Sequence, residues 1–141
     1  MADGIQIEIV SPERLVLSER AESVTVPGTD GYFTVMADHA PLMTTLKPGF
    51  VTVNSGGGSR TYYVRGGFAD VSPEGLTILA EQASTYADFD RTAIERLLTE
   101  AQAQLVGAAT PEEKNFAQEI VSGWMNLMSE AEHIGQQAHI H

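Results

Sequence analysis

The chain has 141 residues and 43% of them are apolar, which is enough for one folded domain with a core, or for a small domain with an appendage, and excludes general disorder. Nineteen Asp and Glu residues against eight Lys and Arg give a formal net charge of −11. The basic residues are scattered, so no basic cluster is present to neutralise nucleic-acid phosphates or to attach the chain to anionic lipid. Because the chain has no cysteine, disulfides, thiolate metal sites and a cysteine nucleophile are excluded.

The sequence carries no targeting or membrane-spanning signal. It begins Met1-Ala2-Asp3-Gly4 and lacks the basic start and the apolar core of a secretory signal. No run of about 18 apolar residues occurs further along the chain. We therefore expect a cytoplasmic protein that neither binds nucleic acid nor inserts directly into a membrane.

Short apolar runs joined by Gly and Pro turns fill the first part of the chain. The first run, Ile5-Gln6-Ile7-Glu8-Ile9, alternates apolar and polar residues with the period of a strand that has one buried face. Further runs lie at residues 15–17, 23–26, 32–36, 42–46, 50–53, 61–64, 68–71 and 76–79. The glycine-rich stretch Ser55 to Ser59 is typical of a hairpin tip. The spacing indicates an antiparallel sandwich or barrel over residues 1–86, and about ten strands suffice for two packed sheets, so we expect a β-sandwich.

The pattern of residues 87–135 is that of two helices. Asp88 and Asp90 are candidate N-caps of the first helix, which is expected to end near Gly107. Thr110-Pro111 is typical of the start of the second helix, and the short connection predicts an antiparallel hairpin. The residues expected to pack the hairpin lie at helical spacing: Ile94, Leu97, Leu98, Ala101, Leu105, Phe116, Ile120, Trp124, Leu127 and Met128.

The helical hairpin is expected to be held only marginally against the sandwich. Each helix has one narrow apolar stripe, so the two stripes cover each other and leave little surface for the sandwich. Trp124 is interpreted as packing within the hairpin, with a contact to a partner as the alternative. Residues 136–141 have no pattern and are expected to form a disordered tail.

The histidines are the residues most easily mistaken for catalytic residues or metal ligands. His39 lies between Asp38 and the nearby threonines, but neither a nucleophile at a strained turn nor an oxyanion hole has a signature here, so we interpret it as a contact residue or as bonded to local backbone. His133, His139 and His141 match no metal-ligand spacing. The sequence therefore predicts no catalytic residue, no metal site and no cofactor.

Two turn signals bracket a stretch that resembles a known family. Pro27 to Gly49 reads PGTDGYFTVMADHAPLMTTLKPG, and it is followed by GGFADV at residues 66–71 and LTILAE at residues 76–81. This combination is similar to the epsilon subunit of the F-type ATP synthase, the counterpart of the mitochondrial delta subunit. The resemblance is specific through about Ser84 and weak beyond it.

The resemblance implies a non-catalytic central-stalk subunit at the cytoplasmic face of the bacterial inner membrane. The sandwich would bind the gamma subunit and the ring of c subunits and rotate with them, so that ion flow through the ring is coupled to the catalytic hexamer. The hairpin would be the part that reaches the alpha and beta subunits. The loops expected to lie toward the c ring contain Gly28, Thr29, Asp30, Gly31, Tyr32, His39, Ala40, Pro41 and Leu42.

Two departures from the family pattern limit what the hairpin is expected to do. In the family the second helix inhibits ATP hydrolysis through basic residues, but here it carries five glutamates against Lys114, so we expect weak inhibition or none. A family ATP-binding motif at the start of the first helix keeps Asp90 but has Ala93 in place of its arginine. Since arginine is the group that would clamp phosphate, ATP binding is not expected.

A free-standing β-sandwich that holds a sugar or a peptide is the alternative to the rotor subunit. The two hypotheses differ in a simple observation. A stalk subunit copurifies with a large membrane-bound complex, whereas a free module is found in the soluble fraction.

Overall fold

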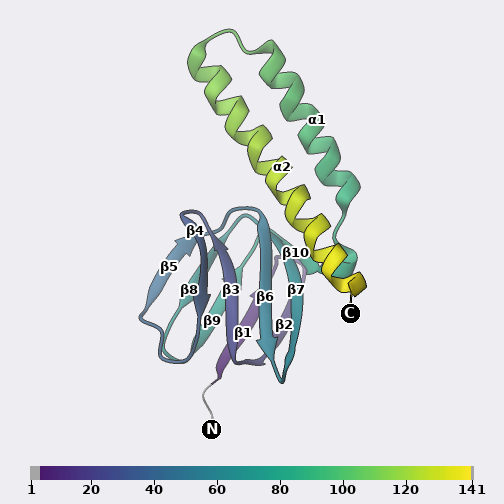
Figure 1. Cartoon of the computed structure of the whole chain (residues 1–141). Coiled ribbons are helices and arrows are strands. Elements are labelled where there is room, and N and C mark those ends of the chain that lie inside the picture. Colours follow the sequence, from purple (N-terminus) through teal and green to yellow (C-terminus); the bar gives the residue numbers. More distant parts are fainter. Residues whose placement is uncertain (1–3, 141) are drawn as a thin grey trace. The chain divides into compact units, whose positions relative to one another are not determined.

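A computed structural model describes the backbone of residues 4–140 and the side chains of residues 4–136. Ten strands form two five-stranded sheets that face each other (Figure 1). The strands are β1 Ile5–Val10, β2 Leu15–Ala21, β3 Ser23–Gly28, β4 Gly31–Val35, β5 Leu42–Thr45, β6 Gly49–Ser55, β7 Gly58–Arg65, β8 Phe68–Val71, β9 Gly75–Leu79 and β10 Gln82–Thr85. The predicted β-sandwich is confirmed.

The first sheet has the order β2-β1-β9-β8-β5 and is called sheet A below. Its β1 and β9 run parallel, with Ile7 opposite Leu76, although the sequence predicted antiparallel pairing throughout. The two strands lie far apart in the chain, so no tight turn forces them to be antiparallel. A register shift at Ile9 and Val10 pairs Val10 with Leu15 and turns both Val16 and Leu17 toward the core.

The second sheet, sheet B, has the order β10-β7-β6-β3-β4. Its edge strand β10 lacks an alternating apolar pattern and was not among the predicted strands. It forms because Gln82–Thr85 pairs with Arg65–Tyr62 of β7, so backbone hydrogen bonds hold it in place of deep burial.

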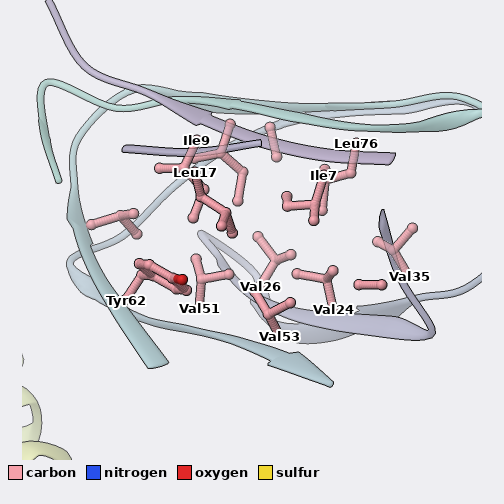
Figure 2. Packing of buried hydrophobic residues seen from close by; sticks show 14 of the residues in the cluster. Ile7, Ile9, Leu17, Val24, Val26, Val35, Val51, Val53, Tyr62 and Leu76 are labelled. Carbon is pink, nitrogen blue, oxygen red and sulfur yellow. The ribbon is translucent and has the colours of Figure 1, made fainter. Parts of the chain in front are cut away.

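The core lies between the sheets. Side chains of sheet A, among them Ile7, Ile9 and Leu76, point toward Val51 and Val53 of sheet B (Figure 2). All five are no more than 2% exposed. The alternation read from the first strand therefore marks the residues that the two sheets bury.

Two helices form the rest of the chain. Helix α1 spans Arg91–Gly107 and α2 spans Pro111–Ile140. Thr110 caps α2 because its Oγ1 accepts a hydrogen bond from the Glu113 N–H at 3.1 Å, and the Glu113 carboxylate accepts one from the Ala109 N–H at 2.9 Å. The predicted helical hairpin is thus present.

The end of α2 differs from the expectation. The sequence predicted a disordered tail over residues 136–141, but the backbone is helical through Ile140. Helix propagation explains this, because glutamine and alanine there have good helix propensity. His141 lies outside the described residues.

The buried stripe of α2 is displaced by one residue from the predicted one near its start. Phe116, predicted to pack the hairpin, is 67% exposed, whereas Ala117 and Val121 are buried. Small side chains let two helices approach closely, and a prediction that favours large apolar residues passes over them. Of the other predicted residues, Ile94, Ala101 and Leu127 are buried, and Leu97, Leu98, Leu105, Ile120, Trp124 and Met128 are half-buried.

The chain divides into two compact units, and the boundary falls between Phe89 and Asp90. The sequence placed it after Tyr86. A short 3-10 helix, η1, spans Tyr86–Asp88 and belongs to the first unit.

Candidate docking surfaces

The outward face of sheet A carries an unexpected row of apolar side chains. Val10, Leu79 and Phe68 stand at outward positions of β1, β9 and β8, next to the buried Ile9, Ile78 and Ala69. The register of the strands places Val10 opposite both Leu15 and Leu79, and Leu79 opposite Phe68. The apolar row is therefore Leu15, Val10, Leu79 and Phe68, and it runs straight across four strands.

The apolar row is open to solvent. Leu15, Leu79 and Phe68 are 57%, 39% and 36% exposed. A groove of about 490 Å³ includes three residues of the row, Val10, Leu79 and Phe68, and is also lined by Ser11, Pro12, Gly67, Ala80 and Glu81. Contiguous apolar side chains on the outside of a sheet make this row a candidate contact surface, because water would favour polar residues there.

A polar row lies beside the apolar row on the same face. Glu8, Thr77 and Asp70 are opposite one another on β1, β9 and β8. The Ser18 hydroxyl of β2 donates a hydrogen bond to the Glu8 carboxylate at 3.4 Å. A groove of about 260 Å³ passes over this row and is also lined by Glu74. The face can therefore offer apolar contact and, next to it, carboxylate acceptors for Lys or Arg of a partner.

The turn between β3 and β4 is held against the end of β5. Gly31 has a φ of +134°, which favours glycine there. The Thr29 N–H donates to the Thr45 carbonyl at 3.0 Å, and the Thr29 hydroxyl lies 2.9 Å from the same oxygen. Since β3 belongs to sheet B and β5 to sheet A, the turn links the two sheets.

Tyr32 follows this turn and is fixed at its ring and its hydroxyl. The Phe50 N–H donates to the Tyr32 hydroxyl at 3.3 Å, and the Lys47 Nζ lies 5.0 Å from the centre of the ring. A groove of about 290 Å³ beside the turn is lined by Gly28, Asp30, Gly31, Tyr32, Phe33, Leu42 and Thr44. Six predicted loop residues thus belong to one region: Gly28, Thr29, Asp30, Gly31, Tyr32 and Leu42.

The rest of the predicted contact set lies elsewhere. His39, Ala40 and Pro41 are in the loop that leaves the other end of β4. The His39 Nδ1 is 2.7 Å from the Ala40 carbonyl, and the Asp38 N–H donates to the Pro73 carbonyl at 3.4 Å. Of the two interpretations of His39, a hydrogen bond to local backbone is present, and a contact with a partner stays a prediction. One flat partner surface at the β3–β4 turn would not also reach His39.

One of the positions that were considered and rejected as ligands has another role in the structure. Asp90, kept from the ATP motif, is the N-cap of α1, since its Oδ1 accepts a hydrogen bond from the Ala93 N–H at 3.0 Å. In the part of the chain that the structure describes, no group of three His, Asp or Glu side chains could hold a metal ion. His133 is exposed, the His139 side chain is not described, and His141 lies outside the described residues.

Sequence reasoning missed the apolar row. The signal was present, because Val10 extends the alternation of β1 with an apolar residue at an outward position, and Leu79 does the same in β9. It could be read only after the strands were placed in register.

Neither helix of the described chain combines the length and apolar character that a membrane crossing requires.

The fold is a β-sandwich followed in the chain by a helical hairpin, and the exposed apolar row makes it a candidate docking subunit of a larger assembly. The family model of the ATP synthase delta/epsilon chain β-sandwich domain matches residues 4–85. An ATP synthase epsilon chain of Mesorhizobium japonicum is 47% identical over 86% of this chain and 91% of its own length, and one of Sinorhizobium fredii is 52% identical over 74% and 79%. The chain belongs to the ATP synthase delta/epsilon family.

Solved structures agree on the fold. A chain of the Euglena gracilis mitochondrial ATP synthase aligns with a TM-score of 0.70 at 22% identity, over 99% of this chain and 82% of its own. A chain of the Tetrahymena thermophila central stalk and c ring aligns with a TM-score of 0.63 at 14% identity, over 90% and 95%. At these identities the likeness concerns the fold.

Proposed function

We propose that this rotor subunit binds the gamma subunit through the outward face of sheet A. The observation that carries the proposal is the apolar row, since four large apolar side chains at outward positions need a protein partner to cover them. Glu8, Asp70 and Glu74 beside the row favour a partner surface with basic side chains around an apolar centre. The complex lies at the cytoplasmic face of the bacterial inner membrane.

The β3–β4 turn is the part we assign to the c ring. It is exposed at Thr29 and Asp30, and it is bound to β5, so a force applied to the turn reaches both sheets. His39 lies at the other end of β4, and we assign it to a separate contact. In this arrangement the sandwich fixes the c ring to the gamma subunit, and rotation of the c ring is coupled to the catalytic hexamer.

The hairpin is assigned a weak role at the alpha and beta subunits. Glu112 and Glu113 stand in the first turn of α2, where they favour the helix dipole but repel an acidic partner. Full restoration of inhibited hydrolysis by the added subunit would contradict this assignment.

The test is binding of purified gamma subunit to the full chain and to Leu79→Ser. Leu79 is 39% exposed, so the change leaves the core intact and removes apolar contact. We expect the dissociation constant to rise by about tenfold or more, as for a central interface residue. Phe116→Ser, which removes a more exposed apolar side chain from α2, is the matched control and should bind as the wild type does. Equal binding by all three chains would exclude the outward face of sheet A.

A further inference from the structure

Four aromatic rings gather on sheet B and the segment that precedes helix α1 in the chain, all within the first unit. Phe50 and Tyr63 are opposite each other on β6 and β7 of sheet B, and are only 3% and 6% exposed although they do not belong to the core between the sheets. Tyr86 and Phe89, from η1 and the residue after it, are the other two rings. The group is called the aromatic latch below.

The rings make a connected set of contacts. The Phe89 ring centre lies 4.8 Å from that of Tyr63 and 5.3 Å from that of Phe50. Tyr86 is 5.9 Å from Phe50 and stacks on Phe89 at 6.5 Å. These are the separations at which tilted and edge-to-face ring pairs attract each other beyond the burial of their area. Phe89 contacts all three other rings, so it is the centre of the latch.

The backbone of the same segment is fixed as well. The Asp88 N–H donates to the Thr85 hydroxyl at 3.3 Å, and the Phe89 N–H donates to the Tyr86 carbonyl at 3.1 Å. Asp90 then starts a separate rigid element, because its side chain caps α1. Only the backbone dihedrals of Phe89 and Asp90 lie between the latch and the capped helix, so these are the bonds about which the chain can still rotate.

We propose that Phe89 is a positioning residue that anchors the segment Tyr86–Phe89 on sheet B, and that any movement of the hairpin pivots at Phe89 and Asp90. Tyr86–Asp88 therefore stays with the sandwich whatever the helices do. The inference goes beyond the docking function and does not depend on which partner the sandwich binds.

Amide hydrogen exchange of the full chain, read by mass spectrometry, tests the pivot. In the wild type the amides of Asp88 and Phe89 should exchange as slowly as those of β10. Val121→Asp places a charge at a buried position of α2 and should speed exchange in both helices by about tenfold or more, while Asp88 and Phe89 stay protected. If the two amides lose protection together with α1, the segment belongs to the hairpin and the proposal is wrong.

Substitutions at the latch test Phe89 itself. Phe89→Ala should speed exchange of the Asp88 and Phe89 amides by about tenfold or more and leave β6 and β7 unchanged, since only ring contacts are lost. Phe89→Tyr keeps the ring and should restore wild-type protection. Phe116→Ala removes an exposed ring from α2 and is the matched control. Unchanged exchange in Phe89→Ala would overturn the proposal.

Discussion

The sandwich and the hairpin bury apolar surface in different ways. The sandwich core is built from large side chains such as Ile7, Val53 and Ile78, each 0% exposed. In the described part of the helical unit, by contrast, several of the buried side chains are small, namely those of Ala101, Ala117 and Ala131. Because free energy follows the apolar area removed from water, the sandwich should be the more stable unit. The comparison predicts that the helical unit unfolds more easily than the sandwich.

The largest expected effect is the loss of a core side chain from the sandwich. Ile78→Ala removes three carbon atoms from the middle of β9 and should lower the free energy of unfolding of the sandwich by about 2–5 kcal/mol. Ile78→Val, as the control, should lower it by about 0.5–1.5 kcal/mol. Denaturant titration followed by circular dichroism measures both values. A loss below that of the valine variant would show that the core is looser than its burial indicates.

A change in the hairpin should leave the sandwich transition where it is. Leu127 is 2% exposed, and Leu127→Ala should destabilise the helical unit by about 2–3 kcal/mol. Trp124 is the only tryptophan of the chain and lies on α2, so its fluorescence reports the hairpin separately. We expect the fluorescence midpoint to fall and the sheet signal to be unchanged. A parallel fall of both signals would mean that the two units unfold together, against the comparison.

The sandwich was largely predictable from sequence because strand signals are local. Alternation at Ile5, Ile7 and Ile9 depends on neighbours in the chain, and turn glycines mark the strand ends. The parallel pairing of β1 with β9 and the strand β10 depend on partners distant in the sequence, and a local pattern does not contain them.

The apolar row was not predicted, for the same reason. The apolar row joins residues of four strands, so Leu15 and Leu79 come to lie on either side of Val10 only in the folded register. The packing of the hairpin depended on how closely the two helices approach, which the size of Phe116 does not indicate. By contrast, the turn around Thr29 was found because its glycines and proline act locally.

A smaller effect is expected at the β3–β4 turn. Thr29→Val removes a hydroxyl that donates to the Thr45 carbonyl at 2.9 Å but keeps the shape of the side chain. The exposed hydrogen bond should contribute about 0.5–1.5 kcal/mol to the stability of the sandwich. Thr29→Ser keeps the hydroxyl and is the control, and the Trp124 transition should not move in either variant. Equal stability of Thr29→Val and the wild type would show that backbone bonds alone hold the turn.

The smallest effect at neutral pH concerns Tyr63 of the aromatic latch. Burial raises the pKa of the Tyr63 hydroxyl above 10.0, and the nearby Arg65 guanidinium partly opposes the shift. Because the folded chain holds this proton more tightly than the unfolded chain, the associated stability is present below pH 10.0 and is lost as the pH rises through the folded pKa.

Tyr63→Phe removes the titrating group and keeps the ring. The difference in unfolding free energy between the two chains should be constant from about pH 8 to about pH 9, and the wild type should then lose stability relative to the variant as the pH rises toward about 11. Other titrating groups are common to both chains and cancel in the difference. The Trp124 signal should show no such dependence, because the latch belongs to the sandwich. A difference that stays flat above pH 10.0 would place the Tyr63 hydroxyl in contact with water, and a latch open to water would not anchor the segment that precedes α1.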